Sequence, residues 1–216
     1  MIEKIIQKFV PPLTLVMIIG LASCDLSKSI PNRSKIPAIP ASQKIEKQDA
    51  SMLSHRTFLI TATGIGPIKL GMSLDEARKA FQEGTFERTS DGDGAALIDV
   101  LLGKDSLMTL YAGEEDPDKP IDWSKKITVI ESFNPACVSE AGLRIGALVL
   151  DAEKIYGKTK SITRSAIESR EYIEFQNNPE HLTFRIDYTG VFPEGSRETA
   201  QFKPQAKIHS ITVSSR

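Results

Sequence analysis

The sequence predicts an α+β fold of two tandem repeats, each a helix followed by an antiparallel meander, with the helices packed on one sheet face. Three observations predict this class: a motif that recurs at a fixed spacing, a capped amphipathic helix, and short apolar strands between turn signals. The 216-residue chain is 40% hydrophobic and 25% charged, which suits a folded domain. We expect one globular domain over residues 57–216, with repeats at about 64–133 and 140–216.

Two short motifs define the repeat. Ile68-Lys69-Leu70-Gly71 matches Leu143-Arg144-Ile145-Gly146, so the two glycines are 146 − 71 = 75 positions apart. A series of matches in the same order indicates two copies of one supersecondary unit. The further pairs at this spacing are Ala77 and Ala152, Lys79 and Lys154, Phe81 and Tyr156, and Leu107 and Leu182; at 208 − 127 = 81 positions they are Ile127 and Ile208, and Ile130 and Ile211.

The helix of the first copy is predicted to begin after Ser73. Ser73 and Glu76 have the spacing of a capping box, in which the serine hydroxyl accepts from the glutamate amide and the glutamate side chain returns to the serine amide. Ala77 and Phe81, four positions apart, lie on one helix face, which should pack on the sheet. Gly84 is expected to end this helix.

The second copy keeps the apolar helix face but not its cap. Val149, Ala152 and Tyr156 occupy the equivalent face, and Gly157 should end the helix. Leu148 stands where the first copy has its capping serine, so the first amide groups of this helix need another acceptor.

Strand patterns follow each helix. Apolar and β-branched runs are bounded by turn signals, of which Asp91-Gly92-Asp93-Gly94 and Asn177-Asn178-Pro179 are the clearest. The expected strands are 85–88, 95–101, 106–111 and 126–133 in the first copy, and 161–163, 171–175, 182–188 and 208–213 in the second.

The N-terminus carries a tripartite leader. Lys4 and Lys8 precede an uncharged, mostly apolar run from Phe9 to Leu21, and small residues then precede Cys24. This run is shorter than the ~20 residues that a spanning helix needs, so export and cleavage fit better than a membrane-spanning anchor. Residues 24–56 should then hold this cysteine and a flexible tether, because prolines, serines and lysines interrupt any helix or strand period there.

Composition argues against nucleic acid as a partner. The chain has 27 Lys+Arg against 28 Asp+Glu and a formal net charge of −1, without a local cluster of basic residues. Apart from Cys24, the only cysteine is Cys137. It could form an intermolecular disulfide, but a small buried hydrophobic residue is favoured because free cysteines are among the most buried residue types.

No motif predicts a cofactor, a metal site or catalytic residues. Gly64-Ile65-Gly66 starts like a dinucleotide-binding loop, but Lys69 stands where the third glycine is required. None of the three histidines, His55, His181 and His209, pairs at a spacing typical of zinc ligands, although the last two could approach each other on neighbouring strands. No serine lies in a G-x-S-x-G motif.

Trp123 is the candidate contact with a partner. It ends the polar, proline-containing segment Asp116–Trp123, and tryptophan is enriched at the energetic centres of interfaces. The alternative is that its ring caps the end of the core from a loop, because tryptophan is usually highly buried.

With these features the chain resembles exported bacterial lipoproteins of unknown function. Leu21-Ala22-Ser23-Cys24 resembles their lipobox, which implies a signal peptide over 1–23, cleavage before Cys24, and acyl chains such as palmitate on that cysteine. The segments Gly64–Phe81 and Lys126–Gly157 resemble the strand–loop–strand–helix signature of that group. The tandem arrangement is similar in outline to beta-lactamase-inhibitor-like and outer-membrane assembly lipoprotein folds, and the resemblance brings no catalytic residues with it.

Two classes of function follow. The first is a non-enzymatic binding or envelope-maintenance module, held to a membrane through lipid on Cys24, on the extracytoplasmic side of the bacterial cell envelope, with an envelope protein as its partner. The second is a periplasmic hydrolase with an active site assembled from dispersed residues. The lack of a recognisable catalytic motif favours the first, whereas a deep pocket with converging titratable groups would favour the second.

Overall fold

The structure is a computed structural model that describes residues 56–216 except 93, 114–115 and 216. The predicted signal peptide over 1–23, the lipidation site Cys24 and all but the last residue of the tether over 24–56 lie outside the described residues. Within the described part of the chain, no helix is long and apolar enough to cross a membrane.

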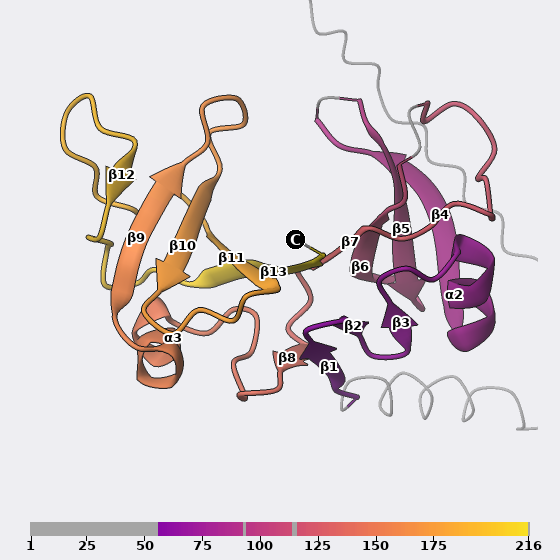
Figure 1. Cartoon of the computed structure of the whole chain (residues 1–216), viewed down its shortest axis with the longest axis horizontal. Coiled ribbons are helices and arrows are strands. Elements are labelled where there is room, and N and C mark those ends of the chain that lie inside the picture. The colour runs from indigo at the N-terminus through magenta and orange to yellow at the C-terminus, as the bar shows by residue number, and fades with distance from the viewer. Residues whose placement is uncertain (1–55, 93, 114–115, 216) are drawn as a thin grey trace, which may run out of the picture. The chain divides into compact units, whose positions relative to one another are not determined.

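The described residues form two sheets and two short helices (Figure 1). The helices are α2 (Leu74–Ala80) and α3 (Val149–Tyr156), of 7 and 8 residues. The strands are β1 (Phe58–Thr61), β2 (Gly64–Ile65), β3 (Ile68–Lys69), β4 (Gly84–Ser90), β5 (Ala96–Leu102), β6 (Asp105–Tyr111), β7 (Val129–Ser132), β8 (Cys137–Ser139), β9 (Thr159–Arg164), β10 (Glu171–Phe175), β11 (Leu182–Ile186), β12 (Glu198–Thr199) and β13 (Ile208–Ser214).

The larger sheet joins both halves of the chain in one antiparallel surface. Its nine strands have the order β12-β9-β10-β11-β13-β7-β6-β5-β4. β13 pairs with β11 on one side and with β7 on the other, and Figure 1 shows β13 and β7 between the strands of the two halves. In this central register Ile211 lies opposite Ser132, and Val213 lies opposite Ile130.

The predicted fold class is wrong: the protein is mostly β, not an α+β repeat of a helix and a meander. Each helix has only about two turns, because the apolar face that predicts it stops at Phe81 or Tyr156 and a strand follows within a few residues. The two meanders also merge, since β7 and β13 pair through residues 211 − 132 = 79 positions apart. Periodicity within each copy carries no information about that pairing.

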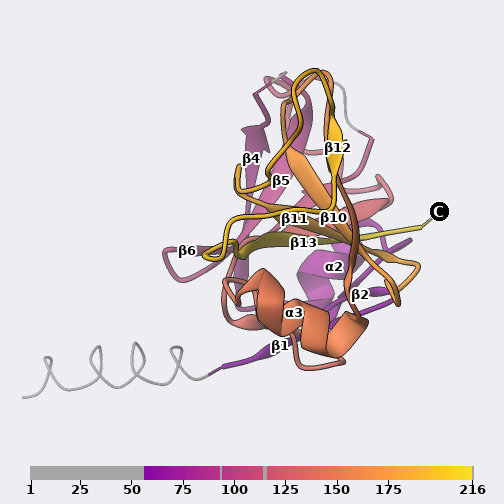
Figure 2. The same ribbon diagram turned by 90° about the vertical axis from the view of Figure 1, so that its left-hand side faces the viewer.

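A second sheet has four strands in the order β3-β2-β1-β8, of which β1 to β3 precede α2 and β8 precedes α3. β1 and β8 pair in parallel, with Ile60 opposite Ser139. β2 and β3 form a tight antiparallel turn that requires Gly64, because a Cβ atom there would lie 2.1 Å from the carbonyl oxygen of Ile68. Figure 2 shows β1, β2 and both helices on the same side of β13.

The two halves of the chain make the same backbone hydrogen bonds before their helices. Gly71 N–H donates to the carbonyl oxygen of Ile127 at 2.8 Å, and Gly146 N–H donates to that of Ile208 at 2.8 Å. The donors are 146 − 71 = 75 positions apart and the acceptors 208 − 127 = 81, the same two spacings as the sequence motifs. The next such pair is Leu74 N–H to Lys125 at 3.0 Å and Val149 N–H to Ala206 at 2.8 Å.

The helix ends follow local sequence signals. The capping box of α2 is confirmed, because Glu76 N–H donates to the Ser73 hydroxyl at 3.1 Å and Ser73 N–H donates to the Glu76 carboxylate at 2.7 Å. Leu148 at the N-cap of α3 makes no side-chain hydrogen bond, as expected because leucine has no polar side-chain atom. Gly157 is confirmed as the C-cap of α3, with φ 81°.

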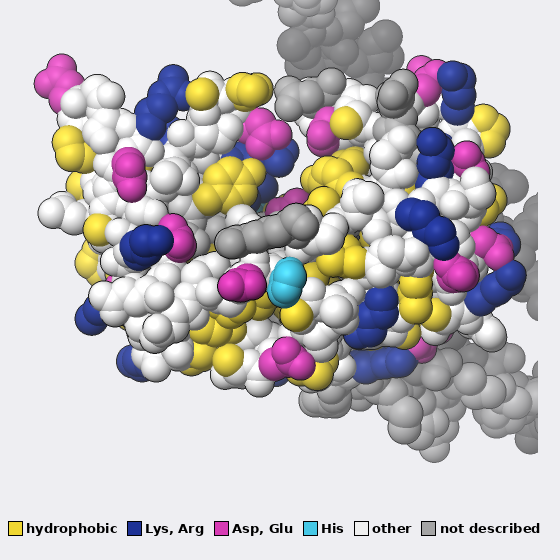
Figure 3. Space-filling view, viewed as in Figure 1, with side chains coloured by type: hydrophobic (Ala, Val, Ile, Leu, Met, Phe, Trp, Pro, Cys, Tyr) yellow, Lys and Arg dark blue, Asp and Glu magenta, His cyan; other side chains and the backbone are white. Residues whose placement is uncertain are grey.

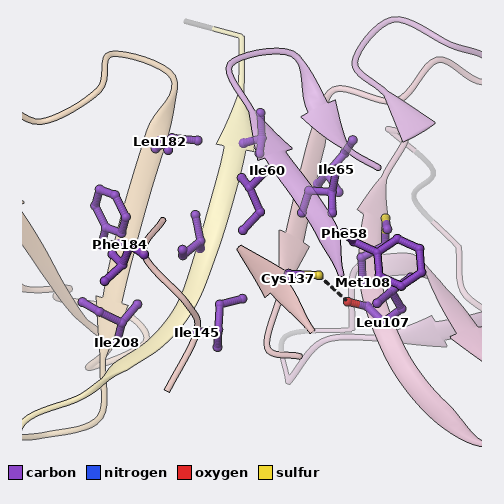
Figure 4. Packing of buried hydrophobic residues seen from close by; sticks show 14 of the residues in the cluster. Phe58, Ile60, Ile65, Leu107, Met108, Cys137, Ile145, Leu182, Phe184 and Ile208 are labelled. Atoms are coloured by element: carbon purple, nitrogen blue, oxygen red, sulfur yellow. Dashed lines mark hydrogen bonds between the residues drawn. The ribbon is translucent and has the colours of Figure 1, made fainter. Parts of the chain in front are cut away.

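One hydrophobic core includes residues of both sheets and both helices. Figure 4 shows Ile60 of β1 between the side chains of the first half, such as Phe58, and those of the second half, such as Leu182 and Phe184. The burial of both helix aromatics is confirmed, with Phe81 only 2% and Tyr156 only 5% exposed. The two positions that the repeat spacing of 75 pairs, 81 and 156, are therefore both core positions.

The capping box predicts an acid-sensitive contribution to stability. Hydrogen bonds from the Ser73 amide, from Lys126 and from the Ser73 hydroxyl lower the pKa of Glu76 from the usual 4.5 to about 2. A carboxyl group whose pKa falls on folding stabilises the folded state above its unfolded pKa, and this contribution is lost as the pH falls through the folded pKa. We therefore expect the difference in the free energy of unfolding between wild type and Glu76→Gln to have its maximum value above a pH of about 4.5. The difference should shrink as the pH falls towards about 2.

Urea unfolding over a pH series measures this difference. As a control, NMR titration of Ser73→Ala should find a higher Glu76 pKa than in wild type, because one of the hydrogen bonds that lower it is gone. A stability difference that does not change over this pH range would contradict the prediction.

Candidate functional site

A pocket of about 260 Å³ lies where β1, the end of β8, α3 and the loop before β11 meet. We call it the Tyr156 pocket, after the tyrosine of α3 that lines it. Its walls include the apolar side chains of Ile60, Pro179 and Leu182. An apolar cavity of about 150 Å³ is enough to hold benzene, so this pocket has room for a small organic ligand.

Ser139 and Tyr156 supply the buried polar atoms of the pocket. They are 2% and 5% exposed, and their hydroxyl oxygens are 2.8 Å apart. Ser139 Oγ also accepts a hydrogen bond from Leu143 N–H at 3.0 Å. Whichever hydroxyl donates to the other, one hydroxyl hydrogen has no acceptor among the described residues and is available to a ligand.

Strand pairing and aromatic packing fix both hydroxyl groups. Ser139 lies opposite Ile60 in the β1–β8 pair, and the next residue, Glu140, donates its N–H to the Ile60 carbonyl oxygen at 3.1 Å. The Tyr156 ring packs against Phe175 and Phe184, with ring centroids 5.9 and 5.3 Å away. The pocket is therefore preformed by regular structure and not by mobile side chains.

Asn178 shapes the loop that forms the remaining wall. Its Nδ2 donates to the carbonyl oxygens of Leu182 at 3.0 Å and Pro179 at 3.2 Å, and its Oδ1 accepts from Phe175 N–H at 3.3 Å. Asparagine readily makes such local bonds to its own turn. The turn predicted at Asn177-Asn178-Pro179 is thus the element that places Pro179 and Leu182 at the pocket.

The charged side chains at the pocket are acidic. Glu140 and Glu180 line it together with His181, and the described residues that line it include no lysine or arginine. Burial raises the pKa of Tyr156, the hydrogen bond with Ser139 lowers it, and the negative charge of Glu140 raises it. The Tyr156 hydroxyl therefore stays protonated at neutral pH and acts as a hydrogen-bonding group, not as a base.

A second hollow, of about 350 Å³, lies at the other end of β11 and β13. We call it the His209 groove. The rings of Phe133 and His209 meet there at a centroid distance of 5.3 Å, and the exposed side chains of Lys207 and Asp187 bring opposite charges. Thr189 has a buried hydroxyl oxygen without a partner among the described residues. Mixed charges and exposed walls make this groove a weaker candidate than the Tyr156 pocket.

A buried carboxylate lies in the nine-stranded sheet close to the join between the two halves. Glu131 of β7 is 8% exposed and accepts hydrogen bonds from the hydroxyls of Ser210 at 2.6 Å and Tyr111 at 3.4 Å. Burial and the charge of Glu131 raise the pKa of Tyr111 to about 12. These bonds link β6, β7 and β13 across the join between the two halves, which is a structural role. In the described residues no group of three His, Cys, Asp or Glu side chains could hold a metal ion.

Trp123 lines neither pocket. Its ring meets Phe86 at a centroid distance of 6.3 Å, the Arg78 guanidinium lies 4.4 Å over it, and its carbonyl oxygen accepts from Asp75 N–H at 2.9 Å. The side chain is partly buried against the core. A contact with a partner and a cap on the core therefore both remain predictions for this residue, as the sequence left them.

The histidines do not form a site. His55 lies outside the described residues. The carbonyl oxygen of His181 accepts from Ser214 N–H at one end of β13, whereas His209 follows Ile208 at the other end. The two therefore do not approach each other on neighbouring strands, contrary to the possibility that the sequence left open.

Cys137 is fully buried in β8, which confirms the favoured interpretation of its thiol. Burial raises its pKa to about 11 despite a hydrogen bond from the Ser132 hydroxyl at 3.2 Å, which lowers it. Since the thiolate is the reactive form, we expect iodoacetamide near neutral pH to leave Cys137 unmodified in the native protein and to modify it after denaturation in urea. Peptide mass spectrometry distinguishes this site from Cys24, and rapid modification of the native protein would show that the thiol is accessible.

Sequence reasoning missed Ser139 and Tyr156 as a polar pair, although the signal was present. The spacing of 75 that pairs Phe81 with Tyr156 also pairs Gly64 with Ser139, since 139 − 64 = 75. Both positions gain a hydroxyl group in the second copy only. That the two hydroxyls meet could not be known without the position of β8 against α3.

Comparison with known proteins adds little to this geometry. No family model matches the chain, and no curated protein matches it. Among solved structures the chain is similar to the uncharacterized protein yfeY from Escherichia coli, with 13% sequence identity and a TM-score of 0.49 over 74% of this chain and 99% of that chain. That bacterial protein is itself uncharacterized, and a likeness of this extent assigns no activity, ligand or partner. The lipoprotein character and the specific folds that the sequence suggested stay predictions.

Proposed function

We propose that this protein is a lipid-anchored binding module of the bacterial cell envelope, without enzymatic activity, and that the Tyr156 pocket is its binding site. The observation that carries the proposal is the buried Ser139–Tyr156 hydroxyl pair in a preformed pocket with apolar walls. Binding sites for small ligands have this character: an apolar enclosure with a small number of fixed polar groups.

The N-terminal sequence supports the envelope location. Leu21-Ala22-Ser23-Cys24 and the apolar run before it support cleavage after residue 23 and acylation of Cys24. Two or three acyl chains hold a protein firmly at a membrane whereas one does not, because each buried CH₂ contributes about 0.8 kcal/mol. A tether of about thirty residues, at about 5–6 Å × √n, lets the domain stand roughly 30 Å from the membrane surface.

The second candidate, a hydrolase, is favoured by one observation: a serine, a histidine and two glutamates line the same pocket. A nucleophilic serine needs a hydrogen bond to a general base. The hydroxyl of Ser139 is instead bonded to Tyr156, whose pKa is raised, and to a backbone amide. Binding therefore fits the geometry better than acyl transfer.

Native mass spectrometry of the protein purified under mild conditions from envelopes tests binding. We expect a small ligand to accompany wild type and to be absent from Ala141→Trp, which fills the pocket, while Glu87→Gln on β4 keeps it. Turnover of an envelope substrate that Ser139→Gly abolishes would establish the hydrolase instead. Ser139→Gly copies the residue of the first repeat.

Two further measurements test the envelope location and the partner. Mass spectrometry of membrane-extracted protein should find acyl chains on Cys24 and no residues before it, and an unmodified Cys24 still joined to Ser23 would refute the anchor. Crosslinking in cells should recover an envelope protein, with a lower yield from Trp123→Ala than from wild type at unchanged stability. An unchanged yield would remove Trp123 as a partner contact.

A further inference from the structure

We propose that the Tyr156 pocket selects a small organic cation, with an ammonium group between Glu140 and Glu180 and an apolar body against Ile60 and Leu182. The proposal rests on the assignment of this pocket as the binding site. It adds the chemical class of the ligand, which neither the sequence motifs nor the comparisons supply.

Charge is the first argument. The described lining of the pocket contains the carboxylates of Glu140 and Glu180 and no lysine or arginine. The backbone of Glu140 is held by the hydrogen bond from its N–H to the Ile60 carbonyl oxygen, so its side chain starts from a defined point at the pocket. The negative charge of Glu140 also reaches the buried Tyr156 hydroxyl, where it raises the pKa. A cation is favoured in this field and an anion is repelled.

The protein as a whole does not share this bias. The face shown in Figure 3 carries Lys and Arg side chains interspersed with Asp and Glu, in line with the formal net charge of −1 of the whole chain. The acidic character therefore belongs to the lining of the pocket, which is what selectivity for a cation requires.

The volume of the pocket and its apolar residues limit the part of the ligand that carries the ammonium group. A volume of about 260 Å³ exceeds the roughly 150 Å³ that holds benzene, so one ring with a short charged arm fits. The apolar part of the wall includes Ile60, which is fully buried, and Leu182, which is only 7% exposed. A bare metal ion would leave these walls unused and finds no group of three His, Cys, Asp or Glu ligands in the described residues.

The hydroxyl pair can receive the cation. Each hydroxyl oxygen has two lone pairs, and Leu143 N–H and the bond between Ser139 and Tyr156 occupy one each. The remaining lone pairs can accept hydrogen bonds from an ammonium group. The pair therefore adds neutral acceptors to the two carboxylates.

The first half of the chain shows that this fold does not need the hydroxyl pair. Gly64 and Phe81 occupy the positions equivalent to Ser139 and Tyr156, at the same spacing of 75, and neither has a polar side-chain atom. Phe81 is nonetheless buried in the core, as Tyr156 is. Tyr156→Phe should therefore keep the packing of the ring and remove only the hydroxyl group.

Titration with three matched probes tests the assignment. The full-length protein is titrated near neutral pH with phenethylammonium, its neutral analogue phenethyl alcohol, and the anion phenylacetate, by calorimetry and NMR. Exposed ion pairs contribute about 0.2–1 kcal/mol each, so two of them predict that phenethylammonium binds about 2- to 30-fold more tightly than the alcohol. Phenylacetate should bind most weakly, and added salt should weaken only the binding of the cation.

Variants locate the effect. In the double variant Glu140→Gln/Glu180→Gln the affinities for phenethylammonium and for the alcohol should become equal, whereas Glu87→Gln on β4 should keep the wild-type ratio. Tyr156→Phe should weaken the binding of both probes in a protein that still unfolds cooperatively, with only the modest loss of stability expected from one buried hydrogen bond.

Equal affinity for the cation and the alcohol in wild type, preference for the anion, or no binding of any probe would each overturn the assignment. These outcomes are distinct from failure of the proposed function. That function is judged by ligand retention in native mass spectrometry and by Cys24 acylation, neither of which uses the three probes.

Discussion

Phe81→Ala should lower the free energy of unfolding by about 3–5 kcal/mol, the usual cost of removing a fully buried phenylalanine ring. Phe81 is 2% exposed, and its ring meets that of Phe58 edge to face at a centroid distance of 5.8 Å. The substitution would remove this aromatic pair and leave a cavity between α2 and the sheets. Because Phe58 belongs to β1, the loss should be felt in the four-stranded sheet as well as at α2.

Equilibrium unfolding in urea measures the change, and Phe133→Ala supplies the matched control. Phe133 is 42% exposed and its ring meets that of His209 in an edge-to-face contact, so the same substitution there should cost about 1 kcal/mol, well below the loss at Phe81. Similar losses for the two variants would mean that Phe81 does not lie in the core and that the register of α2 is different.

The surroundings of Phe81 also correct the role expected of Gly84. The sequence predicts that Gly84 ends the helix, but Phe81 is the C-cap of α2 and Gly84 is the first residue of β4. A Cβ atom at position 84 would lie 2.4 Å from a ring carbon of Phe81. The glycine is required because the backbone of β4 passes directly over the buried ring, a contact that no local pattern reveals.

Local signals predicted local structure well. The capping box depends on two residues three positions apart, Ser73 and Glu76, so its hydrogen bonds could be read from the sequence. The lack of a side-chain cap at Leu148 and the C-cap at Gly157 are of the same kind. The turn at Asn178 was also recognised, although its role in forming a pocket was not.

The prediction of the fold class failed because the fold depends on pairing between strands that are far apart in the sequence. The β7–β13 pair joins Ser132 to Ile211 and turns two separate meanders into one sheet. The β1–β8 pair joins Ile60 to Ser139 and builds a second sheet from segments too short to be recognised as strands. Short strands have weak periodicity, so neither their existence nor their partners could be derived from the pattern.

The candidate site could not be predicted from the sequence for the same reason. Ser139 and Tyr156 are separated by 156 − 139 = 17 positions and by a turn and a helix. Each alone has an ordinary local role, since Ser139 closes the turn to Leu143 and Tyr156 ends α3. Only the fold places the two hydroxyls at 2.8 Å.

Loss of the Arg164 guanidinium should be the other large destabilisation. Glu171 is fully buried at the start of β10 and lies directly opposite Arg164 of β9. One carboxylate oxygen accepts from Arg164 Nη2 at 2.7 Å and Nε at 3.3 Å, and the other accepts from Gly190 N–H at 2.8 Å. The Arg164 guanidinium also lies 4.1 Å over the ring of Phe192.

This arrangement fixes the long segment before β13 to the sheet. A Cβ atom at Gly190 would lie 2.5 Å from the Phe192 ring and 3.2 Å from the Glu171 carboxylate, so only glycine lets the backbone approach the buried charge. The carboxylate therefore holds β9, β10 and the backbone at residue 190 together. Breaking such a pair by removing one partner is costly because it leaves an uncompensated buried charge.

We expect Arg164→Met to lower the free energy of unfolding by about 3 kcal/mol, at the lower end of the range for buried pairs, since the arginine side chain itself is 39% exposed. Lys160→Met on the same strand is the matched control. Its partner Glu174 is 47% exposed, so that loss should stay within about 1 kcal/mol.

The double variant Arg164→Met/Glu171→Gln should recover part of the loss of Arg164→Met, because the amide removes the buried charge while its oxygen can still accept from Gly190 N–H. If urea unfolding instead gives equal losses for Arg164→Met and Lys160→Met, the Glu171 carboxylate is solvated in solution and does not fasten the segment around Gly190 to the sheet.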